Sequence, residues 1–157
     1  MILRDPGLFQ PDLPLSRREL APLLDAALVA MGLSGARYEL RLTDDAGIEA
    51  LNRSFLSTPG PTNVLSFPAG PAAGKGKRGA AVFLGEMAVS VDTAVREAFL
   101  YGQDPVEHFL RLLCHGLSHL AGLDHGEAMD ALSDAALDAA LAAAYDAAVF
   151  SSPSSAC

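Results

Sequence analysis

The chain has 157 residues, of which 50% are hydrophobic and 19% charged, and its formal net charge is −8. This length and apolar content predict one globular domain over residues 1–150, followed by a frayed tail over 151–157, and they exclude a disordered chain. No apolar stretch approaches the roughly 20 residues of a membrane-spanning helix, so no membrane partner is expected. We find no leader-like N-terminal segment and no spaced cysteine framework, which predicts a cytoplasmic protein.

The negative charge is concentrated in the last third of the chain. Residues 104–157 hold eight acidic groups against one basic residue, Arg111, whereas the first 103 residues hold ten basic and eleven acidic groups. This distribution disfavours a generic nucleic-acid binder with a broad basic face. A polyanion would have to meet the first two thirds of the chain or a bound metal ion.

The first predicted elements are a helix and a strand. Ser16 and Glu19 can form a capping box for a helix that runs to about Leu33, and Pro22 either sits in its first turns or shifts its start. Residues 37–42 then alternate apolar and charged side chains, which predicts a half-buried strand.

A second helix and strand are predicted next. The segment 43–45 offers N-caps for a helix that ends before residues 57–61. Its apolar residues recur at i, i+3 and i+7, namely Ile48, Leu51 and Phe55. Residues 63–67 predict a short buried strand, and the glycine-rich, basic segment 69–80 predicts a mobile loop.

The rest of the chain is predicted to form one more strand and three helices. Residues 80–91 predict a central strand, in which Gly85 and Glu86 interrupt the apolar run and indicate a bulge or an exposed end. A helix follows over about 92–101, and an alanine-rich helix over about 127–149 carries one acidic face. That face consists of Asp130, Asp134, Asp138 and Asp146. The mixture of elements predicts an α+β domain with a small mixed sheet.

The helix predicted over 105–121 carries the residues of chemical interest. Asp104, Pro105 and Glu107 form an N-terminal signature of cap, proline and capping carboxylate, and Gly122 is a natural stop. Projected at about 100° per residue, its apolar side chains share one face. They are Val106, Phe109, Leu110, Leu113, Leu117 and Leu120. The histidines fall on the opposite face.

Three of the four histidines lie within the segment HGLSHLAGLDH. His115 and His119 are one helical turn apart, so both imidazoles can reach one ion about 2 Å away, and Gly122 lets the chain return His125 as a third ligand. We interpret the three as a metal site with an open fourth position, although surface histidines can also cluster without a metal. His108 lies about 10 Å from His115 along the axis and cannot share the ion. It is either an exposed helix residue or faces a substrate in the same cleft.

The spacing matches that of the metzincin proteases, H-E-x-x-H-x-x-G-x-x-H, except at one position. The protease glutamate that acts as general base is replaced here by Gly116. Glycine cannot take a proton, so peptide hydrolysis by the usual route is not expected. A metal could still activate water and polarise an oxygen.

The same segment resembles the H-G-x-x-H-L-x-G-x-D-H signature of the YbeY family, bacterial endoribonucleases that mature ribosomal RNA. Two further segments agree with the family in the same order. LNRSFLSTPGPTNVLSFP (51–68) is similar to its L-N-x-x-[YF]-R-x-x-x-x-P-T-[DN]-V-L-S-F-P block, and LGEMAVSVDTAVREA (84–98) is similar to its L-G-[DE]-I-x-I-S block. Together the segments span most of residues 51–125.

The resemblance implies a single α+β domain with helices flanking the sheet, one of them a zincin-like metal helix. It implies one zinc ion per chain, held by His115, His119 and His125. Ser66 would lie near the metal in a cleft wall as a substrate-binding residue, unless it serves only to build that strand. The implied activity is single-strand-specific RNA cleavage in ribosomal RNA maturation, at the 3′ end of 16S rRNA, and in ribosome quality control. Ribosomal RNA and the small ribosomal subunit are the implied partners, and no DNA is expected.

One family position differs. The arginine that follows the aromatic residue of the L-N block is Leu56 here, and an arginine near the metal would suit a phosphate clamp. Arg53, one turn earlier, is a candidate catalytic replacement, or it is an ordinary exposed helix residue. Asp124 and Glu86 are candidates for proton transfer, although either could instead cap or orient a neighbour.

Two classes of function remain open. The first is a metal-dependent endoribonuclease, which a three-histidine site with an open position favours. The second is a ribosome assembly factor with a mainly structural zinc site, which the missing arginine and the acidic charge favour. In either case we expect RNA to meet Arg53 and the basic loop residues Lys75, Lys77 and Arg78, unless that loop is merely solvated.

Overall fold

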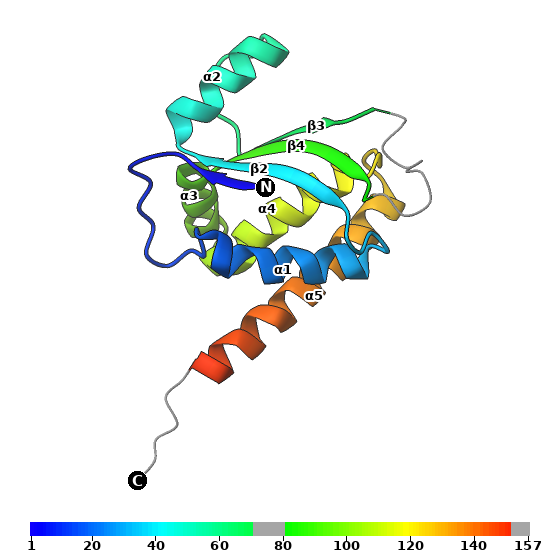
Figure 1. Cartoon of the computed structure of the whole chain (residues 1–157). Coiled ribbons are helices and arrows are strands. Elements are labelled where there is room, and N and C mark those ends of the chain that lie inside the picture. The colour runs from blue at the N-terminus through cyan, green and yellow to red at the C-terminus, as the bar shows by residue number, and fades with distance from the viewer. Residues whose placement is uncertain (71–80, 152–157) are drawn as a thin grey trace.

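Four strands form one mixed sheet in the order β1-β2-β4-β3 in the computed structural model, which describes residues 1–70 and 81–151 (Figure 1). The strands are β1 (Ile2–Arg4), β2 (Arg37–Thr43), β3 (Val64–Pro68) and β4 (Phe83–Ser90). The helices are α1 (Arg17–Ala30), α2 (Asp45–Leu56), α3 (Val91–Tyr101), α4 (Pro105–Leu120) and α5 (Glu127–Ser151). The predicted α+β class with a small mixed sheet is confirmed.

Strand β3 forms one edge of the sheet. It pairs antiparallel with β4, whereas β1, β2 and β4 are mutually parallel. The edge strand β1 has only three residues, too few to show an alternating pattern, and it was not predicted. The prediction of a strand over 37–42 is confirmed, because Tyr38, Leu40 and Leu42 are buried on one face of β2.

The bulge expected at Gly85 is also present. The register between β2 and β4 shifts there, so that Arg37 pairs with Phe83 but Glu39 pairs with Glu86. Gly85 has φ +136°, and a Cβ atom at this position would collide with the carbonyl oxygen of Phe67 on β3. Only glycine therefore allows the two strands to approach this closely.

Helices α1, α3, α4 and α5 lie on one side of the sheet, and α2 lies on the other (Figure 1). The capping box expected at the start of α1 is present, because Glu19 N–H donates to Ser16 Oγ and Ser16 N–H donates to Glu19 Oε2. The core lies between the sheet and the four-helix layer, and α4 contributes much of it. Its fully buried apolar side chains include Phe109, Leu110, Leu113, Leu117 and Leu120.

Helix α2 buries less of its apolar row than its spacing indicates. Ile48 is fully buried, but Leu51 is half-buried and Phe55 is 65% exposed. Asn52 is buried instead, and its Nδ2 donates to the carbonyl of Gly60 at 3.1 Å. Among the described helices, only α2 lies over this face of the sheet (Figure 1), and its last turn stays largely exposed to solvent apart from a ring contact of Phe55 with Phe67.

The loop expected over 69–80, with its basic residues, falls mostly on residues 71–80, outside the described part of the chain. The expected tail over 151–157 also lies outside it, apart from the last residue of α5. The acidic face predicted for α5 is solvent-exposed at Asp130, Asp134, Asp138 and Asp146. Among the described helices, none combines the length and apolar character needed to cross a membrane.

Candidate metal centre and its cleft

Helix α4 begins as its sequence predicts. The Asp104 side chain accepts a hydrogen bond from Glu107 N–H at 2.9 Å, and Pro105 occupies the first helical position, where its missing N–H costs no hydrogen bond. The helix ends at Leu120, close to the predicted stop. The two histidines near its C-terminal end are therefore carried on rigid, well-capped structure.

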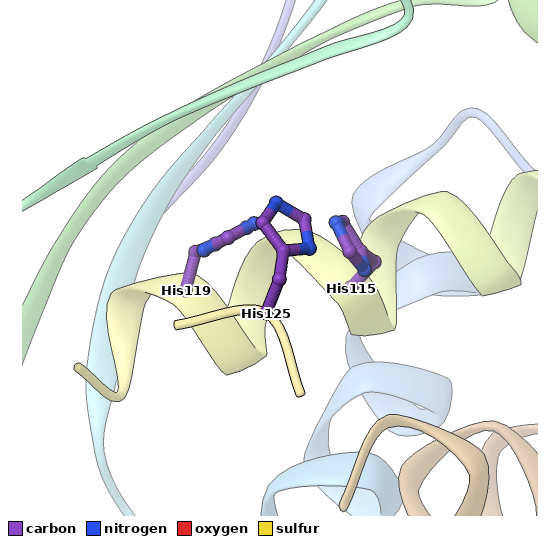
Figure 2. A group of neighbouring side chains, drawn as sticks. All are labelled: His115, His119 and His125. Atoms are coloured by element: carbon purple, nitrogen blue, oxygen red, sulfur yellow. The ribbon is translucent and has the colours of Figure 1, made fainter. Parts of the chain in front are cut away.

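The turn after α4 brings back the third histidine. Gly122 has φ +89°, a left-handed conformation that favours glycine, and its N–H donates to the carbonyl of His119. Leu123 N–H then donates to the carbonyl of Ser118 at 3.2 Å. This closed turn reverses the chain, so that His125 lies beside the helix it has just left (Figure 2).

The three predicted ligands converge. One ligand nitrogen from each of His115, His119 and His125 can be chosen so that all three lie within 4.8 Å of one another. The ring centroids are 4.7 to 5.3 Å apart, and the rings face a common space (Figure 2). Zinc–nitrogen bonds of about 2.0–2.1 Å in tetrahedral geometry place nitrogens about 3.3 Å apart, which small side-chain rotations would achieve. The donor set and its spacing fit a metal ion.

Local contacts prepare the imidazoles for metal binding. His119 Nδ1 lies 3.2 Å from the carbonyl oxygen of Leu123. A carbonyl can only accept, so Nδ1 donates and Nε2 keeps its lone pair for a ligand. Burial, and then the neighbouring His119 and His125, lower the pKa of His115 below its ordinary value. A lowered pKa favours the neutral imidazole, which is the form that binds metal.

Packing explains the residue between the first two ligands. A Cβ atom at Gly116 would lie 2.9 Å from Met87 Sδ, 3.2 Å from Val64 Cγ2 and 3.3 Å from Ser66 Oγ. Gly116 therefore lets α4 pack directly against the sheet. A glutamate at this position, as in the metzincin proteases, would have no room.

The histidines line a cleft of about 590 Å³ between β3, α4 and the turn after α4. Two other predicted site residues, Ser66 and Asp124, also line it. Ser66 Oγ donates to the carbonyl of Gly116 at 3.3 Å. Glu86, the other candidate for proton transfer, lies outside this cleft and lines a separate hollow with Phe55 and Phe67.

Arg53 is not brought together with the histidines. It does not line the cleft, its side chain is 68% exposed, and its Nη2 donates to Glu49 Oε1 at 2.7 Å. Leu56 is also exposed. The structure instead places Arg111 in the cleft wall, one turn before His115. Its i−4 spacing from His115 was visible in the sequence, but spacing alone does not separate a cleft residue from an ordinary surface arginine.

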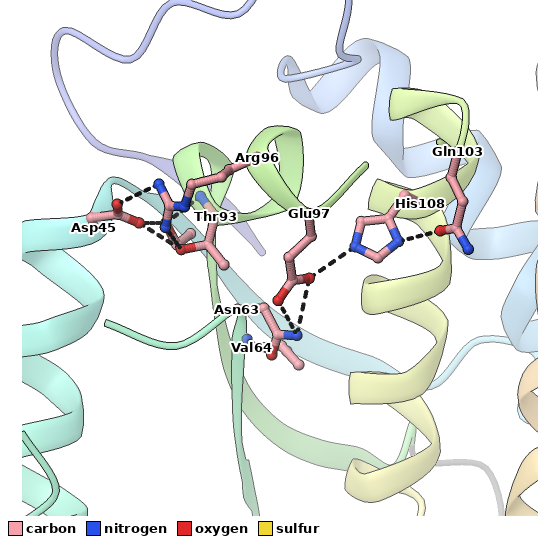
Figure 3. A network of polar contacts seen from close by, with 9 residues as sticks. Asp45, Asn63, Val64, Thr93, Arg96, Glu97, Gln103 and His108 are labelled. Carbon is pink, nitrogen blue, oxygen red and sulfur yellow. Dashed lines mark hydrogen bonds and ion pairs between the residues drawn. The ribbon is translucent and has the colours of Figure 1, made fainter. Parts of the chain in front are cut away.

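His108 differs from both sequence expectations. It is buried, not exposed, and it does not line the histidine cleft. Its Nε2 contacts Glu97 Oε2 at 2.9 Å and its Nδ1 contacts Gln103 Oε1 at 2.7 Å (Figure 3). The projection correctly placed it on the histidine face of α4, but α3 packs against the N-terminal half of that face. Glu97 also accepts from Asn63 Nδ2, which joins α3 to the start of β3.

The family model described as endoribonuclease YbeY matches residues 16–144, most of the chain. The chain belongs to the YbeY endoribonuclease family. A YbeY endoribonuclease of Oleidesulfovibrio alaskensis is 46% identical over 136 residues, covering 77% of this chain and 80% of the relative. Another YbeY endoribonuclease, from Nitratidesulfovibrio vulgaris, is 44% identical over 148 residues, covering 87% of this chain and 91% of the relative.

Membership of the YbeY family confirms the resemblance noted in the three sequence segments and the prediction of a metal-dependent endoribonuclease. The fold has its own support. A solution structure from Thermotoga maritima matches 99% of both chains with a TM-score of 0.64, at 19% sequence identity. At that identity the match concerns the fold alone.

Proposed function

We propose that the protein is a zinc-dependent endoribonuclease that cleaves single-stranded RNA in the histidine cleft. The observation that carries this proposal is the convergence of three imidazoles, from one helix and the turn after it, in an open cleft. Three protein ligands with a free position are typical of catalytic zinc, whereas structural zinc usually has four. The family supplies RNA as the substrate class.

In this proposal His115, His119 and His125 hold one zinc ion per chain. When bound, the ion lowers the pKa of water towards neutrality and polarises a phosphoryl oxygen. Gly116 cannot move a proton, so another group must do so. We assign this role to the Asp124 carboxylate, which lines the cleft directly before His125 in the chain. Ser66, in the opposite wall, contacts the RNA through its hydroxyl.

We further propose that the RNA is ribosomal. The agreement of three motif segments with the YbeY family supports a role in maturing the 3′ end of 16S rRNA and in ribosome quality control. The small ribosomal subunit would then be the partner, and the cytoplasm the place of action. The exposed acidic face of α5 repels phosphate, so the subunit should approach the histidine cleft from a direction that avoids this face.

A second function is favoured by one observation. The family arginine is replaced by exposed Leu56, and Arg53 is paired with Glu49 away from the cleft. A ribosome assembly factor with a mainly structural zinc ion would need no phosphate clamp there.

The role of Arg53 in an enzyme can be tested separately. If Arg53 clamps phosphate, Arg53→Ala should lower RNA cleavage by about one to three orders of magnitude. Leu56→Arg should then restore cleavage in the Arg53→Ala protein.

The deciding experiment is cleavage of an end-labelled RNA that carries the 3′ end of 16S rRNA, in single-stranded and duplex form. The enzyme proposal predicts cuts in the single strand, loss of cutting with a chelator and recovery with added zinc. His119→Ala should lose both zinc and cleavage, whereas Asp124→Asn should keep zinc and lose about 10²–10⁴-fold in rate. Stoichiometric zinc without any cleavage would support the assembly factor instead.

A further inference from the structure

Arg111 is the residue with a permanent positive charge among the described residues that line the histidine cleft. It lies four residues before His115, which corresponds to about 6 Å along the helix axis and a rotation of about 40°. Arg111, His115 and His119 therefore follow one another on successive turns of one face of α4. None of the roles assigned above uses this arginine.

The present contacts of Arg111 leave much of its guanidinium unused. Its Nη2 donates to Glu107 Oε1 at 2.9 Å, and its Nη1 lies 3.9 Å from Asp134 Oδ1, beyond hydrogen-bond distance. Its Nε is buried without a hydrogen-bond partner among the described residues. The side chain as a whole is 42% exposed. Exposed pairs such as that with Glu107 are weakly held and exchange readily for a stronger partner.

The charges around the cleft show why an anionic substrate would need this arginine. Asp124 lines the cleft, and exposed Asp134 of α5 lies beside Arg111. A phosphodiester that enters among these carboxylates needs positive charge on the protein as well as on a metal. Arginine meets this need well, since its planar fork can donate two parallel hydrogen bonds to one phosphate.

We propose that Arg111 binds an RNA phosphate next to the three histidines, in place of the arginine that is absent at position 56. The proposal rests on the proposed function, because it places RNA in the histidine cleft. On approach of the phosphate, the guanidinium exchanges its Glu107 contact for the phosphate oxygens. The competing interpretation is a structural role, in which Arg111 only links α4 to Asp134 on α5.

The test compares Arg111→Gln and Arg111→Lys with Arg18→Gln, a matched control on the exposed surface of α1. The first readout is the affinity of the full-length protein for a short fluorescent single-stranded 2′-O-methyl RNA, verified to remain intact, across a salt series. Arg111→Gln should weaken binding by about three- to tenfold and reduce the slope of log affinity against log salt by about 0.7. Arg111→Lys should keep the slope, and Arg18→Gln should match the wild type.

The second readout is cleavage of the unmodified RNA, with zinc content and thermal unfolding measured on the same samples. Arg111→Gln should lower the cleavage rate by about 10²–10³-fold with zinc content unchanged, and Arg111→Lys should recover part of it. A wild-type salt slope in Arg111→Gln would overturn the proposal. It would do so even if Arg111→Gln lowers the unfolding temperature as much as Asp134→Asn, which is the result expected when Arg111 only links α4 to α5. If the wild type itself fails to cleave, the proposed function fails, while the salt slopes still decide the role of Arg111.

Discussion

Gly116 illustrates, at the scale of single residues, how packing restricts chemistry. Its missing side chain lets α4 approach the sheet, with Met87 and Val64 within contact of where a Cβ would stand. The same closeness excludes the general base that the metzincin proteases carry at this position. In the proposed mechanism the proton-transfer group comes from a different element, the turn that holds Asp124.

Gly116→Glu should therefore destabilise the fold and should not create a protease. Overpacking and a buried carboxylate together should cost at least about 2 kcal/mol in the free energy of unfolding. Denaturant unfolding measures this cost, and Ala50→Glu on the exposed surface of α2 is the control. Equal stability of the two variants would show that α4 does not pack against β3 and β4 as described.

His108 shows that a residue on the metal-bearing face of a helix can be structural. It links Glu97 of α3 to Gln103, and Glu97 in turn holds Asn63 at the start of β3 (Figure 3). This chain of contacts joins α3 and the start of α4 to the start of β3. The histidine cleft lies between the same two elements.

His108→Leu should lower stability without removing metal. It leaves the partly buried Glu97 with Asn63 as its remaining described partner, which should cost about 2 kcal/mol and lower the unfolding temperature by about 4–8 °C. Zinc content measured on the same sample should equal that of the wild type, whereas His125→Ala should lose zinc. A zinc-free but fully stable His108→Leu protein would mean that His108 belongs to the metal site.

At the scale of elements, the first turn of α2 is tied to the end of β4 and to α3. Asp45 accepts hydrogen bonds from Ser90 and Thr93, and it also pairs with Arg96 at 3.0 Å (Figure 3). Partial burial raises the pKa of Asp45, but the bonds from Thr93, Arg96 and Ser90 outweigh it, so the pKa lies below its ordinary value of 3.8. The ionised carboxylate therefore stabilises the folded state.

Asp45→Asn should cost about 1 kcal/mol near neutral pH, after allowance for solvent screening. A carboxylate whose pKa is lowered by folding stabilises above its unfolded pKa and loses that effect as the pH falls through its folded pKa. The difference between Asp45→Asn and wild type should therefore shrink below about pH 4 in denaturant unfolding curves. Asp12→Asn, at an exposed site before α1, is the control. A pH-independent difference would contradict the role of the charge.

Most helices and strands could be predicted from local sequence patterns, because the interactions that determine them involve residues close together in the chain. The capping box at Ser16, the cap at Asp104 and the alternation along β2 all depend on neighbours in the chain, and each is present as expected. The same holds for the three histidines, whose convergence follows from helical spacing and one glycine turn. The burial of His108, the exposure of Phe55 and the place of Arg111 depend on which elements pack together, which spacing within one segment does not determine.

At the scale of the whole molecule, the cleft combines segments that are far apart in the sequence. Edge strand β3 supplies one wall, and α4 with its C-terminal turn supplies the other. The acidic face of α5 is exposed, and the predicted RNA contacts lie on the first two thirds of the chain and in the cleft. The central claim is that one metal ion, held by three imidazoles in this cleft, is required for RNA cleavage.

The most direct test is a titration of metal-free protein with zinc, in which cleavage of the 16S 3′-end RNA is followed at each addition. The account predicts no cleavage without zinc, a linear rise and a plateau at about one equivalent per chain. In His115→Ala, no amount of zinc up to that plateau should restore the rate. Full cleavage by the metal-free protein, or an unchanged titration in His115→Ala, would contradict the account.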